Sequence, residues 1–458
     1  MEAKKRMGRD LTTGSVPKGL IAFATPLFLS NMLQAVYNMV DMVVVGKYVG
    51  SVGLSAVSIG GDILNMLTFV AMGFSNAGQI IISQYTGAGR KDKVTKLIGT
   101  MFTFLLICAV TIMTLGMAFH GTIIDLLNTP GEAVADVTAY VMVCLSGLIF
   151  IYGYNMVSAV LRGMGDSKHP FIFISIAAVL NLVLDILFVM VLDMGPGGAA
   201  LATVVSQAVS FIACTVFLVI RRKEFQLSIS FMHFVRWRKN MLGSLVKLGV
   251  PMAILSASVQ VSKLFVNSWI NSYGLAVSAF AGIANKIANI SYLVANALNT
   301  AGSTMVGQNI AAREFGRVKK VMLEVGKISI TLAVLISVLI CVFPLQIFGI
   351  FTSDTAVLEL VNGYIPIAVL LFFGSALRAI MNAFINGSGN TQVNFFTAIL
   401  DSFVLRIGLA LLFGLALNMK HYGFWLGDAL AGFTPFWIGL IFYFSGRWKK
   451  GKEHVEAE

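Results

Sequence analysis

The chain alternates long apolar runs with short polar segments. A helix needs about 20 mostly apolar residues to cross a bilayer, and twelve runs reach that length. They lie at residues 18–46, 54–82, 97–119, 137–161, 170–192, 198–220, 245–271, 278–305, 324–345, 360–385, 393–417 and 423–445. This pattern predicts an all-α polytopic membrane protein with twelve transmembrane helices.

The composition agrees with this interpretation. Hydrophobic residues make up 57% of the chain and charged residues only 12%, whereas soluble proteins average about 45–50% and about 25%. A soluble fold could not bury so much apolar surface. The four cysteines lie inside apolar runs without CxxC spacing, which argues against zinc or disulfide frameworks. We expect no cofactor.

The positive charges indicate the orientation of the chain. Most of the 33 Lys and Arg residues fall in alternate segments between the apolar runs, beginning with the N-terminal tail and ending with the C-terminal tail. This distribution is typical of cytoplasmic loops, so we expect an inner-membrane protein with both termini in the cytoplasm. The net charge is +12, but the bases form no separate domain, so we do not expect nucleic-acid binding.

An internal repeat divides the helices into six and six. Sliding the chain by about 224 residues aligns Pro26 with Pro251, SQYTGAGRKDKV (83–94) with GQNIAAREFGRV (307–318), and GMGDS (163–167) with GSGNT (387–391). The predicted division is an N-terminal lobe at 1–220, a cytoplasmic linker at 221–244 and a C-terminal lobe at 245–458. Both halves start on the same side, which predicts parallel repeats with a substrate site near the midplane and transport by alternating access.

Several segments resemble the multidrug and toxic compound extrusion (MATE) family. The similarity is carried by PLFLSNMLQAVYNMVDMVVVGKYVG (26–50), LRGMGDSKHP (161–170), LNLVLDILFV (180–189) and GQNIAAREFGRVKK (307–320). The resemblance covers nearly the whole chain and is closer to the DinF-type branch than to the NorM-type branch. It implies two six-helix lobes and export of drug-like compounds, coupled to inward flow of protons or sodium ions.

Asp41 is the leading candidate for a coupling residue. It lies in the middle of the first apolar run, four residues after Tyr37. An ionised carboxylate at the bilayer centre costs about 2.5–3.5 kcal/mol or more, so such residues usually serve a function. Asp41 is therefore a candidate proton carrier with Tyr37 beside it. The structural alternative is a hydrogen bond to a neighbouring helix.

A second polar group lies on the fifth and sixth predicted helices. Asn181 and Asp185 are four residues apart and share one helix face, and Thr203 follows on the next helix. With Asp41 they offer oxygen ligands suited to sodium, or carboxylates that could share a proton. The resemblance implies the same assignment, because these positions match family residues implicated in cation coupling. No other metal is expected.

Four further residues are candidates for supporting roles. Tyr140, Asn155 and Ser158 place polar groups on the fourth predicted helix, where family analogues hydrogen-bond near the cavity; ordinary interhelical polar contacts are the alternative. Pro26 interrupts the first helix, and a hinge or a static kink would both explain it.

The second half carries a different set of charges. Lys263, Lys286 and Arg378 could line a cavity and favour anionic or zwitterionic substrates, although such residues more often snorkel or pair. Asp401 and Arg406 fit a structural pair. NorM-type relatives have an acidic residue on the tenth helix, where this chain has Arg378 and no carboxylate, which favours coupling through the first half.

Two rival functions follow from the same residues. The basic second half would suit a flippase for a lipid-linked or anionic substrate, from the same superfamily. The segment GMGD, with Gly163, Gly165 and Asp166, matches the GxGD of intramembrane aspartyl proteases, but glycine-rich turn chemistry explains it better. We therefore expect a monomeric secondary antiporter in membrane lipid that exports small amphipathic molecules, and not an enzyme.

Overall fold

The computed structural model describes residues 9–126, 129, 131–228 and 239–450, and within these ranges it is helical and contains no strand. Ten helices are long and apolar enough to cross a membrane. A further span is built from Gly131–Ser146 and Leu148–Gly163, which meet at a bend of 49°. With the more polar 37-residue helix α10 (Leu275–Ala311), the twelve predicted helices are confirmed.

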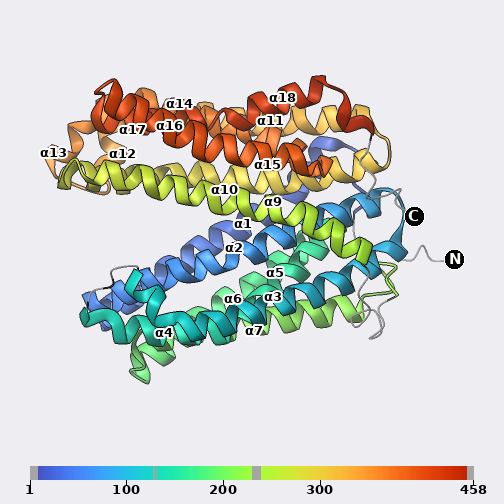
Figure 1. Cartoon of the computed structure of the whole chain (residues 1–458), viewed down its shortest axis with the longest axis horizontal. Helices are drawn as coiled ribbons and strands as arrows, with labels where there is room; N and C mark the ends of the chain where they lie inside the picture. Colours follow the sequence, from blue (N-terminus) through green and yellow to red (C-terminus); the bar gives the residue numbers. More distant parts are fainter. Residues whose placement is uncertain (1–8, 127–128, 130, 229–238, 451–458) are drawn as a thin grey trace. The chain divides into compact units, whose positions relative to one another are not determined.

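The helices of the first half extend beyond the predicted apolar runs, because polar residues at their ends continue the helical backbone. In chain order they are α1 (Val16–Tyr48), α2 (Ser51–Gly87), α3 (Lys91–Leu126), η1 (Gly131–Ala133), α4 (Val134–Ser146), α5 (Leu148–Gly163), α6 (Lys168–Asp185), the π-helical segment η2 (Ile186–Val191) and α7 (Gly195–Ile220). Figure 1 shows α2 to α7 in blue to green.

The second half contains more breaks than the sequence predicted. Its elements are α9 (Lys239–Asn271), α10, α11 (Phe315–Val342), α12 (Pro344–Gly349), α13 (Thr355–Leu358), α14 (Leu360–Ser388), α15 (Thr391–Ile399), the π-helical segment η3 (Leu400–Ile407), α16 (Gly408–Leu411), the π-helical segment η4 (Leu412–Ala416), α17 (Lys420–Ala431), α18 (Thr434–Phe444) and η5 (Arg447–Lys450). They are yellow-green to red in Figure 1.

The chain forms two compact units that share two helices. Unit 1 contains residues Leu29–Ala253 and the short segment before Leu11, and unit 2 contains Leu11–Phe28 and the chain from Ile254 onward. The helix α1 therefore passes from unit 2 to unit 1 after Phe28, and α9 passes from unit 1 to unit 2 after Ala253. The division into lobes at the 221–244 linker stays a prediction.

The bend within the fourth span of unit 1 lies at Gly147. A Cβ atom built on this glycine would lie 2.3 Å from Cγ2 of Val204 on α7. The absence of a side chain thus lets α7 approach the junction between α4 and α5. Nearby, the hydroxyl of Tyr152 on α5 donates to the carbonyl of Leu67 on α2 at 2.7 Å, which ties these two helices together.

In unit 2, side chains of the repeated motif at 307–318 form hydrogen bonds with the backbone of residues 11–14. The backbone N–H of Leu11 donates to Oε1 of Gln308 at 3.0 Å, and its carbonyl accepts from Nδ2 of Asn309 at 3.1 Å. Arg317 donates to the carbonyls of Thr13 and Gly14, each at 2.9 Å. These bonds satisfy backbone groups just before α1 begins, so the polar motif has a structural role.

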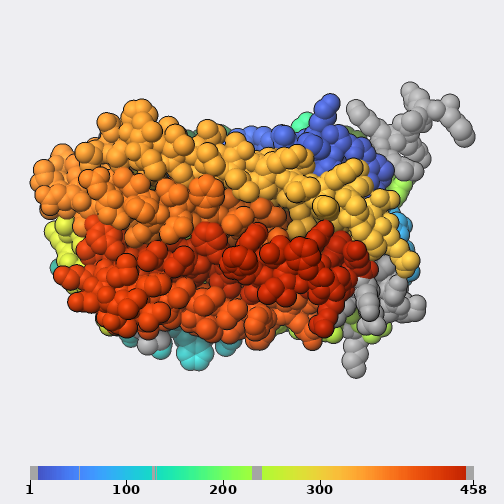
Figure 2. Space-filling model, turned by 90° about the horizontal axis from the view of Figure 1, so that it is seen from above, coloured from blue at the N-terminus to red at the C-terminus, as the bar shows by residue number. Residues whose placement is uncertain are grey.

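The outer surface of unit 2 is apolar, as a bilayer requires. On α18, Trp437, Ile441 and Phe444 are exposed by 59%, 72% and 76%. The face of the molecule in Figure 2 includes this helix, in red. Leu20 and Phe23 of α1, in contrast, are fully buried in a core with Met305 and Phe384. The hydrophobic residues therefore serve both the interior and the lipid-facing surface.

Candidate functional site

Three predicted coupling residues are deeply buried in unit 1. Asp41 on α1 is 7% exposed, Asn181 on α6 is 2% exposed, and Asp185, the last residue of α6, is fully buried. The carboxyl groups of Asp41 and Asp185 are near enough to influence each other electrostatically. The structure thus brings together two acidic residues that lie far apart in the sequence.

The oxygen atoms of this cluster have no counter-charge. Among the described residues, Oδ1 of Asp41, Oδ1 of Asn181 and both carboxyl oxygens of Asp185 have no hydrogen-bond partner. In the same part of the chain, no Lys, Arg or His forms an ion pair with either carboxylate. Two ionised carboxylates without partners cannot both persist in such a place. The cluster must take up a proton or another cation.

The neighbouring helix α7 fixes the orientation of the amide. Nδ2 of Asn181 donates to the hydroxyl of Thr203 at 3.5 Å. The amide nitrogen of Asn181 is thereby engaged, and its oxygen Oδ1 remains as an acceptor without a partner. Directly after Asp185 the helix widens into the π-helical segment η2, a feature often found at functional sites.

Two tyrosines border the acidic cluster. Tyr37 on α1 lies near both Asp41 and Gln207, the latter on α7. Tyr140 on α4 interacts with both Asp41 and Tyr37. The sequence analysis missed Gln207, although it lies four residues after Thr203 and therefore shares its helix face. That spacing was the available signal.

Asn155 and Ser158 make other contacts. Nδ2 of Asn155 donates to the carbonyl of Ile151 in its own helix at 2.8 Å. Oγ of Ser158 accepts from Arg162 at 2.7 Å, and Arg162 also donates to Oε1 of Gln79 at 2.8 Å. In the described residues the structure does not bring Asn155 or Ser158 into hydrogen bonds with Asp41 or Asp185.

Pro26 lies inside α1, and the helix continues through it from Val16 to Tyr48. Its repeat counterpart Pro251 lies in the same way inside α9. Each helix crosses from one compact unit to the other two residues after its proline. A missing backbone hydrogen bond therefore lies just before each crossing point.

The GMGD segment connects the end of α5 to the start of α6. Oδ1 of Asp166 accepts from the backbone N–H of His169 at 3.2 Å, and Oδ2 contacts Nδ1 of the same histidine at 2.6 Å. Gly165 has φ +88°, and a Cβ there would lie 2.4 Å from the carbonyl oxygen of Arg9. The positive φ of Gly165 fits the predicted glycine-rich turn, and the contacts of Asp166 give it a helix-capping role that was not predicted.

Unit 2 contains a buried network of paired charges. Arg378 binds both carboxyl oxygens of Asp401, at 2.8 and 2.9 Å. Arg406 contacts Asp401 at 3.2 Å and also pairs with Asp428. The predicted pair of Asp401 and Arg406 is present, and Arg378 is bound into it. Arg378 also donates to the carbonyl of Ala431 at 3.4 Å.

The two other cations of the predicted cavity remain outside this network. Nζ of Lys263 on α9 lies 5.6 Å from the ring centroid of Tyr292, the geometry of a cation–π contact. Lys286 on α10 is exposed, and neither lysine forms an ion pair within the described residues.

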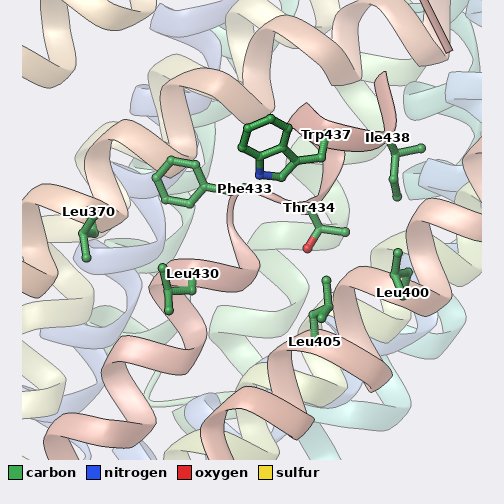
Figure 3. A pocket seen from close by; sticks show the side chains of 8 residues that line it. All are labelled: Leu370, Leu400, Leu405, Leu430, Phe433, Thr434, Trp437 and Ile438. Atoms are coloured by element: carbon green, nitrogen blue, oxygen red, sulfur yellow. The ribbon is translucent and has the colours of Figure 1, made fainter. Parts of the chain in front are cut away.

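A larger cavity in unit 2 has apolar walls. Its volume is about 490 Å³, and its side chains come from α14, η3, α17 and α18 and from Phe433, directly before α18, as Figure 3 shows. The lining residues are Leu370, Leu400, Leu405, Leu430, Phe433, Thr434, Trp437 and Ile438. It has no charged lining residue, so it cannot supply the coupling chemistry.

The many apolar membrane-spanning helices and the buried charges within them define a polytopic membrane transporter. Comparison with known families supports this class: the MatE family model matches residues 26–187 and again residues 251–412. The chain belongs to the MATE family. The two equal matches, beginning at Pro26 and Pro251, also confirm the internal repeat.

Individual relatives extend over nearly the full chain. It is 30% identical over 448 residues to the probable multidrug resistance protein YpnP of Bacillus subtilis, covering 98% of this chain and 99% of that protein. It is 29% identical to the probable multidrug resistance protein YoeA of the same organism, covering 95% of each. A multidrug resistance MATE family transporter solved in an outward-facing conformation superposes with a TM-score of 0.88 at 22% identity, over 97% and 98% of the two chains, which shows a shared fold.

Proposed function

We propose that this protein exports small amphipathic, drug-like molecules across the inner membrane in exchange for protons or sodium ions. Asp41 and Asp185 carry the coupling ion, and Asn181, Thr203, Tyr37 and Tyr140 support them. The relatives named as multidrug resistance proteins support the substrate class. Both termini lie in the cytoplasm, the protein acts as a monomer, and coupling through the first half follows the DinF-type pattern.

One observation carries the proposal: two buried carboxylates interact with each other and lack any cationic side chain. Two like charges in an apolar site favour binding of one proton or one metal cation between them. The four unpartnered atoms are all oxygen acceptors, which is the ligand type that sodium prefers. A site of this kind releases its ion only when its surroundings change, as alternating access requires.

The continuous helices α1 and α9 support alternating access. Each has residues in both compact units, and each has a proline two residues before the crossing point. Proline removes a backbone hydrogen bond and lowers the resistance of a helix to bending. Binding of the ion at Asp41 then changes the bend of α1 at Pro26. If Pro26→Ala transports like the wild type, this hinge proposal is wrong.

Ethidium transport tests the main proposal. Uptake into inverted vesicles, or efflux from loaded cells, is measured for the wild type and Asp41→Asn under separate proton and sodium gradients. We expect the wild type to move the dye under one gradient, which identifies the ion, and Asp41→Asn to lose at least about 90% of that activity.

The matched control is Asp125→Asn. Asp125 lies near the end of α3 in the same unit, beyond the apolar run, and is exposed, so its replacement removes the same charge without touching the site. We expect this variant to retain transport. An equal loss in both variants, or dye movement by the wild type under neither gradient, would contradict coupled export through Asp41.

The flippase is the second candidate, and the cation Lys263 in the membrane part of unit 2 favours it. Reconstituted protein and a fluorescent lipid-linked saccharide analogue would distinguish the two functions. Translocation of the headgroup without ethidium transport would support the flippase. We expect the opposite result, because the acidic cluster of unit 1 is suited to ion coupling.

A further inference from the structure

A small cavity in unit 2 has an unusual excess of hydrogen-bond donors. Its volume is about 30 Å³, enough for a small polar group, and its walls come from α9, α10, α14 and α17, which are labelled in Figure 1. The residues that line it are Lys263, Val266, Asn267, Ile270, Asn285, Tyr364, Leu371, Trp425 and Asp428.

Five of these side chains carry donors: an ammonium, two amides, a phenol and an indole N–H. Within the described part of the chain, none of the five has a hydrogen-bond partner; they are Lys263, Asn267, Asn285, Tyr364 and Trp425. The one carboxylate in the wall, Asp428, is paired with Arg406. Lys263 and Asn285 are exposed, whereas Tyr364 and Trp425 are buried. The cavity therefore offers donors at its mouth and in its wall, and an acid that is already neutralised.

The charged side chains around the cavity have a net charge of one positive unit. Arg378 and Arg406 are balanced by Asp401 and Asp428 through the ion pairs of the buried network. Lys263 lies within electrostatic range of that network but forms no ion pair in it. The cation–π contact with a ring does not neutralise the ammonium charge, so the site is suited to an anion.

The internal repeat places this cavity at the counterpart of the acidic cluster. The register that aligns Pro26 with Pro251 puts Val266 at the position of Asp41. The register of the two glycine motifs likewise puts Tyr364 at the position of Tyr140. The same place in the repeat thus holds unpartnered acceptors in unit 1 and unpartnered donors in unit 2.

We infer that this cavity binds the carboxylate of a transported molecule, so that the protein accepts zwitterionic or anionic amphipathic substrates. A carboxylate presents two acceptor oxygens in one plane, and a charge-assisted bond from Lys263 holds it more strongly than a neutral donor would. Trp425 and Tyr364 supply aromatic walls for the attached apolar group. This inference names the substrate class of the proposed export function. Its claim about transport rests on that function, whereas its claim about carboxylate binding does not.

A pair of dyes that differ in a single carboxylate tests this inference. Rhodamine 110 has a free carboxylate, and rhodamine 123 is its methyl ester. Binding of each dye to the purified full-length protein in detergent is measured by fluorescence anisotropy. We expect Lys263→Met to weaken rhodamine 110 binding about tenfold, which corresponds to about 1.4 kcal/mol. Binding of the cationic rhodamine 123 should not weaken.

Two variants serve as controls. Lys263→Arg keeps the positive charge and should retain rhodamine 110 binding. Lys327→Met removes a lysine from α11 that pairs with Glu324 at 2.7 Å and does not line the cavity, so it should affect neither dye. Undiminished rhodamine 123 binding shows that Lys263→Met is folded.

Three results would overturn the inference: equal loss of both dyes in Lys263→Met, no loss of either, or displacement of rhodamine 110 by short-chain phosphatidylglycerol but not by benzoate. The last result would assign the cavity to a lipid headgroup. Vesicle transport of the same dyes is measured separately. If binding separates as expected but neither dye is exported under either gradient, the export function fails and the carboxylate site stands.

Discussion

Asp185 in unit 1 and Asp401 in unit 2 are both fully buried aspartates at the edge of a π-helical segment, but their neighbours differ. Asp401 is held by two guanidinium groups, from Arg378 and Arg406. Asp185 faces a second carboxyl group, that of Asp41, and no cationic side chain within the described residues. A paired carboxylate has no need of an external ion, whereas an unpaired one does. The difference separates a structural acid from an acid that is available for coupling.

The largest effect on stability is expected when Asp401 loses one of its two guanidinium partners. Arg406→Met leaves Asp401 and Asp428 with fewer partners in a buried site. Removing one partner of a buried ion pair costs about 3–5 kcal/mol, so we expect a large fall in the free energy of unfolding, measured by denaturant titration in detergent. Arg221→Met breaks the surface pair with Glu224 and should cost about 1 kcal/mol or less. Equal losses would contradict the buried network.

Replacement of the unpaired Asp185 in unit 1 should affect transport more than stability. Asp185→Asn keeps the shape of the side chain but cannot ionise, so ion-coupled transport should fall about 100-fold, equivalent to about 2.7 kcal/mol. The free energy of unfolding should fall by less than about 1 kcal/mol, because no ion pair is lost. Vesicle transport and denaturant titration of one preparation measure both quantities. A loss of stability as large as that of Arg406→Met would remove the distinction between the two units.

The hydroxyl of Tyr37, beside Asp41, is expected to affect the affinity for the coupling ion. Tyr37→Phe removes a hydroxyl that interacts with Asp41 and Gln207, and one hydrogen bond is worth about 0.5–1.5 kcal/mol. We expect a change of about three- to tenfold in the ion concentration that gives half-maximal transport. Tyr152→Phe is the control, since it loses a hydrogen bond to Leu67 outside the cluster and should leave ion dependence unchanged.

The smallest effect is expected at Thr203. Thr203→Val removes the acceptor of the long 3.5 Å bond from Asn181, so the amide can rotate and present its donor to the carboxylates. We expect transport to fall about two- to threefold, because a bond of this length is weak. Thr203→Ser keeps the hydroxyl and should behave like the wild type. Identical behaviour of the two variants would show that the amide is held in another way.

Much of the fold could be predicted from local patterns. The apolar runs gave twelve helices because span length follows bilayer thickness, and the repeat was visible in Pro26 and Pro251 and in the glycine motifs. Asn181 and Asp185 could be grouped because residues four apart share a helix face. That Asp41 lies near Asp185 was implied by the resemblance, but no spacing in the sequence shows it.

The remaining features depend on contacts between distant segments. Arg378 is 23 residues from Asp401 and was considered as a cavity residue, whereas its guanidinium binds that carboxylate. Asn155 was grouped with the cavity by its residue type, yet it donates to its own helix. Neither outcome leaves a periodic signal in the sequence. The bend at Gly147 and the donor-rich cavity likewise require coordinates, because each depends on what another helix presents.

The sharing of α1 and α9 between the units also constrains how the protein is synthesised. Leu20 and Phe23 of α1 pack with Met305 and Phe384, which are translated much later than they are. Until the second half has been synthesised and inserted, lipid or insertion factors must cover the apolar face of this part of α1. A gene cut in the 221–244 linker would therefore yield two pieces that need each other, and co-expression rather than separate production should restore the native protein.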